Sequence, residues 1–168
     1  MQFVVKKFWD GTALAKSEWV TFILNVFQDQ LTINISAPLL SKSQPPFMSG
    51  ITSKQQKLWE YEVAEIFFAN DTGEYLEIQL GPYGHYLCLS FKNYRGKSKT
   101  LMLTQTQAAI NNNQWCGQII LPVSNLPINC DSMNCYYAAN KETHLAALSH
   151  TGTKADFHNL SAFVPYPL

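Results

Sequence analysis

Short segments in which apolar and polar residues alternate run through most of this chain, and turn-forming residues separate them. Residues 31–37 (LTINISA) alternate without a break, and every second residue of 20–26 is apolar. Residues 76–80, 87–91 and 119–121 repeat the pattern. A period of two predicts β-strands with one buried face, and many short strands between turns are typical of a sandwich or barrel. We therefore predict an all-β protein with a jelly-roll-like, antiparallel β-sandwich fold.

The length of 168 residues fits one domain, so we predict a single sandwich over residues 1–168. A hydrophobic fraction of 46% with 14% charged residues is typical of a globular protein. Residues 38–57 form the longest connection and hold three prolines. We predict one long loop there, which is either a functional lid or a surface excursion. Residues 104–112 are the segment that could form a short helix, although their asparagine run favours an early end.

Charge and hydropathy argue against several classes of partner. Twelve Lys and Arg residues balance twelve Asp and Glu residues, whereas nucleic-acid binders usually carry a basic excess, so we expect no nucleic-acid partner. The same balance gives no support for binding to a membrane surface. No apolar run approaches the roughly 18 residues that span a bilayer, and Lys6 and Lys7 interrupt the N-terminal apolar stretch. We therefore expect a cytoplasmic protein, and no pattern indicates its oligomeric state.

The four cysteines are expected to be reduced thiols. Cys88, Cys116, Cys130 and Cys135 form no Cys-x-x-Cys motif, and no cluster of histidines accompanies them. At this length a domain needs no disulfide or metal to be stable. We expect no metal site and no cofactor.

A hairpin between residues 59 and 80 concentrates the functional residue types. Residues 59–68 lead into an Asn-Asp-Thr-Gly turn at 70–73, and residues 75–80 return. The simplest register places Phe67 opposite Tyr75 and Glu65 opposite Glu77. One face of the hairpin is then apolar. The other face carries Trp59, Tyr61, Val63, Glu65, Phe67, Tyr75, Glu77 and Gln79.

The next turn sets how a third strand joins this hairpin. Residues 81–84 (Gly-Pro-Tyr-Gly) fit a type I turn with proline second and glycine fourth. A two-residue connection would align Ile78 with Leu87 and extend the apolar face, and Tyr86 would join the mixed face. A bulge beside Gly84 would change this register.

The mixed face is suited to binding sugars. Aromatic rings stack on the C–H faces of sugar rings, while carboxyl and amide groups bind hydroxyls, and a few polar groups in an apolar surround are typical of ligand sites. The alternative is that the aromatic residues are there as good strand formers and pack against another layer. Like charges that face each other are destabilising. The pair Glu65 and Glu77 therefore needs a cation, a shared proton, a bound polyol, or a partner such as Arg95.

The motif order of the chain resembles that of the family 9 carbohydrate-binding modules. The motifs are Trp59 before a Val-x-Glu-x-Phe strand (63–67), an aromatic-x-Glu strand start (75–77), a Pro-x-Gly turn (82–84), and Trp115 before a strand that ends in Leu121-Pro122. The resemblance implies a β-sandwich of the carbohydrate-binding-module type. Sugar-binding modules of this family clamp a sugar between two tryptophans. Here Trp59 alone lies on the candidate face, with Tyr61 or Tyr75 as candidate partners, and the acidic calcium-binding loops are missing.

The sequence looks closer still to an uncharacterised, single-domain branch of that superfamily. The shared features are Trp9-Asp10-Gly11-Thr12, the Leu-Trp-x-Tyr-Glu-Val stretch at 58–63, and Asp156-Phe157-His158 before Phe163 and Pro165. They cover essentially the whole chain. This branch implies a cytoplasmic or nuclear β-sandwich, and it carries no activity that could be transferred.

Asp156 and His158 complete the candidate ligand-binding set, which is Trp59, Tyr61, Glu65, Tyr75, Glu77, Gln79, Asp156 and His158. A carboxylate can orient an imidazole for base catalysis, contact a ligand, or pin a chain terminus. The leading hypothesis is a binding module for a carbohydrate or another polyhydroxylated small molecule. The alternatives are a protein-interaction sandwich and an enzyme acting on a sugar derivative through Glu65, Glu77 and His158. We favour a protein that is not an enzyme, and we assign no catalytic residue.

Overall fold

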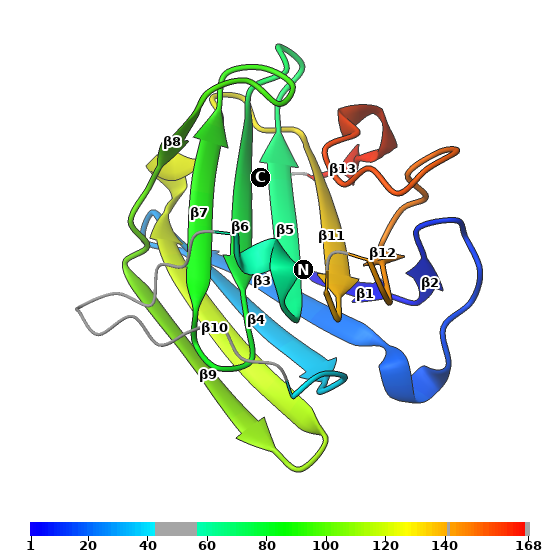
Figure 1. Cartoon of the computed structure of the whole chain (residues 1–168). Helices are drawn as coiled ribbons and strands as arrows, with labels where there is room; N and C mark the ends of the chain where they lie inside the picture. The colour runs from blue at the N-terminus through cyan, green and yellow to red at the C-terminus, as the bar shows by residue number, and fades with distance from the viewer. Residues whose placement is uncertain (43–56, 141, 167–168) are drawn as a thin grey trace.

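A computed structural model describes residues 1–42, 57–140 and 142–166, and it contains two antiparallel β-sheets packed face to face (Figure 1). The predicted antiparallel β-sandwich is therefore confirmed. The first sheet has the strand order β1-β3-β4-β10-β9. Its strands are β1 (Gln2–Val5), β3 (Val20–Phe27), β4 (Gln30–Pro38), β10 (Gln114–Pro122) and β9 (Gln105–Asn111).

The second sheet has the order β2-β12-β11-β5-β6-β7-β8, and β13 also pairs with β11. Its strands are β2 (Lys7–Phe8), β12 (Ala146–Ala147), β11 (Ser132–Ala138), β5 (Val63–Ala69), β6 (Tyr75–Leu80), β7 (Tyr86–Phe91), β8 (Ser98–Thr100) and β13 (Val164–Pro165). Short 3-10 helices connect some strands: η1 (Lys16–Glu18), η2 (Leu58–Glu60), η3 (Val123–Asn125) and η4 (Leu160–Ala162). Among the described residues, no helix is long and apolar enough to cross a lipid bilayer.

Trp115 of β10 lies in the core between the sheets and links them. Its indole N–H donates a hydrogen bond to the Tyr137 hydroxyl of β11 over 3.0 Å, and the two rings are stacked. Gly117 provides the room for this contact, because a Cβ there would lie 2.6 Å from Leu80 Cδ2 and 2.8 Å from the Trp115 ring. A glycine is therefore needed where a core ring and the opposite sheet approach the same backbone atom.

Glu62, which precedes β5, holds the start of the long connection. Its carboxylate accepts hydrogen bonds from the backbone N–H of Leu40 over 2.8 Å and of Ser41 over 2.5 Å. The Tyr137 hydroxyl lies within hydrogen-bond distance of the same carboxyl and of the Pro38 carbonyl oxygen. We call these groups the Glu62 network. The predicted long loop itself, residues 38–57, falls mostly on residues 43–56, which lie outside the described residues.

The second sheet differs from the first because its central strands are buried on both faces. All residues of β5 and β6 are buried, whereas β3 and β4 alternate between buried and more exposed positions. The inner face of the second sheet contributes to the main core. Its outer face carries two smaller apolar clusters. They are Phe67, Ala69, Tyr75, Phe91, Tyr136 and Ala147 at one end, and Leu58, Val63, Leu87 and Ala138 at the other.

Two sequence expectations about secondary structure and pairing were wrong. Within residues 104–112 the structure has strand β9 (Gln105–Asn111) rather than a short helix, because this segment pairs with β10, and Asn112 lies in the turn between the two strands at φ 57°. Edge pairing of this kind is set by tertiary context, which overrides a weak helix signal.

The pairing of β7 with β6 also differs from the expected register. The turn at 81–84 forms, with the Gly84 N–H bonded to the Gly81 carbonyl, but Gly84 adopts a left-handed φ of 83° and adds one residue to the loop. This is the three-residue hairpin with a glycine bulge. Ile78 consequently pairs with Cys88 rather than Leu87. Each side chain of β7 changes face, so Leu87, Leu89 and Phe91 lie on the outer face and Tyr86 lies in the core.

Candidate functional site

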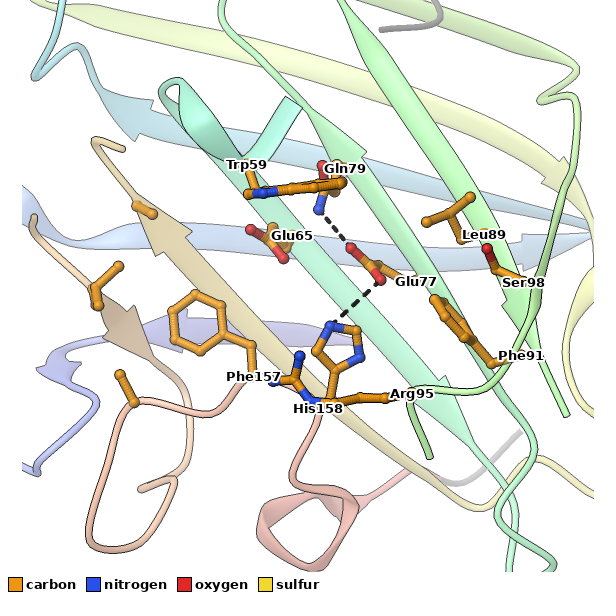
Figure 2. Close-up of a pocket in the computed structure, with 13 residues that line it drawn as sticks. Trp59, Glu65, Glu77, Gln79, Leu89, Phe91, Arg95, Ser98, Phe157 and His158 are labelled. Carbon is orange, nitrogen blue, oxygen red and sulfur yellow. Dashed lines mark hydrogen bonds and ion pairs between the residues drawn. The ribbon is translucent and has the colours of Figure 1, made fainter. Parts of the chain in front are cut away.

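A cavity of about 530 Å³ opens on the outer face of the second sheet, between the two small apolar clusters. Small-molecule sites usually have volumes of roughly 300–1,000 Å³. The polar lining consists of Glu65, Glu77, Gln79, Arg95, Ser98 and His158, and the main apolar lining consists of Trp59, Leu89, Phe91, Ala138, Leu145 and Phe157. Figure 2 shows the Trp59 indole on one side of the carboxyl groups and His158 with Arg95 on the other.

The two carboxyl groups reach the cavity from neighbouring strands, in a register two residues away from the expected one. Glu65 of β5 pairs with Gln79 of β6, and Glu77 pairs with Phe67. The predicted direct pairing of Glu65 with Glu77 was therefore wrong, because the loop between β5 and β6 is centred on Thr72, with the Asn70 N–H bonded to the Glu74 carbonyl and Gly73 at a φ of 85°. A shift of two residues keeps the faces unchanged. Both carboxyl groups still line the same cavity, as diagonal neighbours.

Burial makes both carboxyl groups retain their protons more strongly than free glutamate. Desolvation raises the pKa of Glu65 well above its ordinary value, and the nearby Glu77 raises it further. Desolvation also raises the pKa of Glu77, while the Gln79 amide and Arg95 partly offset this. A low-dielectric site disfavours two adjacent negative charges, so the pair holds a proton at pH values where free glutamate is ionised.

Gln79 has one satisfied and one unsatisfied end. Its Nε2 donates a hydrogen bond to Glu77 Oε1 over 2.5 Å, whereas its Oε1 is buried without a partner in the described structure. The residue is only 1% exposed and lines the cavity. A buried acceptor without a donor is costly, so a ligand hydrogen-bond donor at this oxygen would relieve the cost.

A chain of hydrogen bonds orients His158. The Arg95 backbone N–H donates to the Tyr75 hydroxyl over 3.2 Å, and that hydroxyl lies 2.9 Å from His158 Nδ1. A hydroxyl that accepts from Arg95 donates to Nδ1, which leaves the proton of the neutral imidazole on Nε2. Nε2 lies 3.9 Å from Glu77 Oε2 (Figure 2). Burial, followed by the charge of Arg95, lowers the pKa of His158 to about 4, so the imidazole is neutral at pH 7 and this contact is not an ion pair.

Asp156 anchors the wall of the cavity rather than orienting the imidazole. Its carboxylate accepts hydrogen bonds from Arg95 Nη2 and from the Tyr94 hydroxyl, each over 2.8 Å, and from the His158 backbone N–H over 3.1 Å. The segment that carries Asp156 and His158 is a turn, with the Asn159 N–H bonded to the Asp156 carbonyl. These bonds hold the pKa of Asp156 below its ordinary value despite burial.

Of the eight predicted site residues, five line the cavity and three do not. Trp59, Glu65, Glu77, Gln79 and His158 line it. Trp59 comes from η2 rather than from the predicted strand, and it is 40% exposed. Tyr75 does not line the cavity but supports two residues that do. Its buried ring stacks on Phe91 at a centroid distance of 4.4 Å, and its hydroxyl forms a hydrogen bond with His158. Asp156 acts through Arg95, and Tyr61 is a partly buried residue outside the lining set.

Sequence reasoning did not assign several lining residues to the site. Leu89 and Phe91 were placed on the wrong face because a two-residue connection was assumed, whereas the alternative, a bulge beside Gly84, is what the structure has. The glycine at position 84 was the sequence signal for that bulge. Arg95 and Phe157 lie in turns, which have no periodicity to reveal where a side chain points.

None of the four cysteines is among the residues that line the cavity. All four cysteines are free, and Cys88, Cys130 and Cys135 are buried. Within residues 1–42, 57–140 and 142–166, no group of three or more His, Cys, Asp or Glu side chains could hold a metal ion.

Comparison with known proteins places the chain among curated relatives. It is 32% identical to the "UPF0462 protein C4orf33 homolog" of Mus musculus, over 99% of this chain and 91% of the relative. It is also 32% identical to the "UPF0462 protein C4orf33" of Homo sapiens, over 97% of this chain and 86% of that protein. The Danio rerio homolog is 29% identical over 81% of this chain and 68% of its own length. No family model matches the chain.

The fold is shared with a solved structure. It is a crystal structure of a "putative carbohydrate-binding protein" from Bacteroides uniformis, with a TM-score of 0.70. The match covers 98% of this chain and 84% of the other at 12% sequence identity, so it is evidence for the fold alone.

Proposed function

This chain belongs to the UPF0462 family, and from that premise we propose that it is a binding module whose outer-face cavity takes a carbohydrate or a similar polyhydroxylated small molecule. The observation that carries the proposal is the combination of one exposed tryptophan with three buried polar side chains in a single cavity. Trp59 offers an apolar ring surface, while Glu65, Glu77 and Gln79 offer hydrogen-bonding groups beneath it.

This arrangement matches the two surfaces of a sugar ring. The C–H face of a pyranose is apolar and stacks on an aromatic ring, and its hydroxyl groups require donors and acceptors in fixed positions. Gln79 Oε1 lacks a donor, and His158 Nε2 points its proton toward the carboxyl pair. The likeness in fold to a protein described as carbohydrate-binding supports the same proposal.

Binding of neutral monosaccharides and disaccharides, measured by isothermal titration calorimetry after a glycan-array screen, tests the proposal. We expect Trp59→Ala to weaken binding about 10-fold or more, because the stacking surface is lost. The matched control is Phe27→Ala, which removes a 73% exposed aromatic ring from β3 in the other sheet and should leave binding unchanged. Absence of binding to every glycan, or equal binding by Trp59→Ala and wild type, would contradict the proposal and favour the protein-interaction alternative.

A second candidate function is catalysis on a sugar derivative. It is favoured by the two cavity carboxyl groups with raised pKa values beside a neutral imidazole, since proton transfer needs groups that exchange protons near neutral pH. Incubation of the protein with each bound glycan distinguishes the two functions. A binding module returns the glycan unchanged, whereas an enzyme yields a product that is absent with Glu77→Gln.

The domain and location assignments belong to the same proposal. We propose that residues 1–168 form one domain, which limited proteolysis would test by releasing no smaller stable fragment. A cytoplasmic location stays a prediction, and fractionation of cells that express the tagged protein would check it.

A further inference from the structure

The polar atoms that face the cavity are mainly hydrogen-bond acceptors. Glu65 and Glu77 present carboxyl groups, and Gln79 presents an oxygen that is buried without a donor in the described structure. These three side chains are 4%, 4% and 1% exposed. The unpaired amide oxygen of Gln79 is a second observation, separate from the two carboxyl groups. Like them, it would be satisfied by a ligand that brings N–H or O–H donors.

The cations near the cavity do not neutralise the carboxyl pair. Arg95 forms an ion pair with Asp156 over 2.8 Å, and its side chain is 53% exposed at the rim. Its charge offsets only part of the rise in the pKa of Glu77 that burial causes. His158 is neutral because burial lowers its pKa. None of the ion pairs among the described residues includes Glu65.

The other titratable groups near the pair are uncharged at neutral pH. Tyr75 and Cys88 interact electrostatically with Glu77, and Tyr136 interacts with Glu65. Burial raises the pKa of all three groups. The site therefore holds two carboxyl groups without a resident positive charge of their own, under an aromatic ring.

We propose that the ligand of this cavity carries a protonated amine beside its hydroxyl groups, as an amino sugar does. The proposal rests on the proposed function and names the ligand class. The ammonium would lie between Glu65 and Glu77, donate to Gln79 Oε1, and face the rings of Trp59 and Phe157, whose negative faces attract a cation. A neutral sugar leaves the pair sharing its proton, whereas an ammonium displaces that proton to solvent.

Glucosamine and glucose at pH 6.5 are the matched probes, because they differ by an amine in place of a hydroxyl. We expect the wild-type protein to bind glucosamine at least about 10-fold more tightly than glucose. N-acetylglucosamine, which has no charge, should bind no better than glucose. Calorimetry in two buffers of different ionisation enthalpy should show proton release with glucosamine and none with glucose.

Glu65→Gln removes the carboxyl that has no cationic partner, and it should reduce the ratio of the glucosamine affinity to the glucose affinity to about one, whatever its effect on the glucose affinity itself. The matched control is Glu74→Gln, which removes a carboxyl that is paired with Lys92 outside the cavity and should preserve the preference. Equal binding of both sugars by wild type, or a preference that survives Glu65→Gln, overturns this inference and leaves the proposed function intact. Failure of both sugars to bind counts against the proposed function itself.

Discussion

Glu62 and Glu65 are three residues apart, and burial raises the pKa of both carboxyl groups, yet they have very different surroundings. Glu62 meets two backbone N–H donors and the Tyr137 hydroxyl, so its desolvation is offset by hydrogen bonds. Glu65 shares a cavity with a second carboxyl and one amide. Buried polar groups in a folded protein are normally satisfied. The contrast indicates that Glu62 stabilises the fold, whereas burial of Glu65 beside Glu77 lowers the stability of the free protein. Hydrogen bonds from a ligand would offset that loss.

The largest expected effect is on the Glu62 network. Glu62→Ala leaves the N–H groups of Leu40 and Ser41 and the Tyr137 hydroxyl without their carboxylate, in a site that is 1% exposed. We expect a loss of about 3–5 kcal/mol in the free energy of unfolding. Urea denaturation followed by circular dichroism measures it. A loss below about 1 kcal/mol would remove the distinction between the two carboxyl sites.

Two tyrosines allow a second test of this comparison, because the hydroxyl of one forms hydrogen bonds in the Glu62 network and the hydroxyl of the other forms one beside the cavity of Glu65. Tyr137→Phe removes a partner of Trp115 Nε1 and of Glu62 in the buried core, so we expect a loss of about 2–3 kcal/mol. Tyr75→Phe removes the partner of His158 beside the cavity, where water can take its place. We expect a loss of about 1 kcal/mol. Thermal melts of the two variants should rank them in this order, and the reverse order would contradict the contrast.

Glu65→Gln should raise stability, and the gain should grow with pH. A carboxyl with a raised pKa in the folded state binds more protons when folded, so the unfolding free energy falls as pH rises through that pKa. His158, with its pKa lowered to about 4, has the opposite effect, but only below pH 6.5. Between pH 6.5 and 8 the carboxyl pair therefore dominates. We expect wild type to lose about 1–2 kcal/mol more than Glu65→Gln over that range.

Chemical denaturation at several pH values gives both curves. Parallel curves would show that Glu65 does not share a proton with Glu77. A loss of more than about 3 kcal/mol in Glu65→Gln would mean that a buried cation depends on this carboxylate, and the cavity would then be a structural network.

The smallest expected effect is that of Arg95→Gln. Its ion pair with Asp156 is half-exposed on the arginine side, and such pairs contribute at most about 1 kcal/mol. The informative readout is the imidazole of His158. Its pKa, about 4 in the wild type, should rise because the charge of Arg95 helps to lower it. An NMR pH titration of the histidine ring protons measures the shift, and an unchanged His158 pKa would show that the charge of Arg95 does not contribute to it.

The sequence predicted which strand face each side chain occupies better than it predicted the pairing registers or the loop residues that line the cavity. The period of two assigned Glu65, Glu77 and Gln79 to one face, and a two-residue error in pairing left that assignment intact. The one-residue bulge at Gly84 was different, because it moved Leu89 and Phe91 to the cavity side. Loop residues such as Arg95 follow no period, so their contacts depend on tertiary packing that local sequence does not specify.

Strand β5, buried on both faces, has a consequence for how relatives of this protein can diverge. A single inserted or deleted residue in β5 or β6 would move core side chains such as Ile66 to the cavity and the carboxyl of Glu65 to the core. Strands with one exposed face, such as β3, lose less from the same event. Length changes during evolution of the family should therefore accumulate in turns and in the first sheet, and alignments of homologous genes should be free of gaps across residues 63–69 and 75–80.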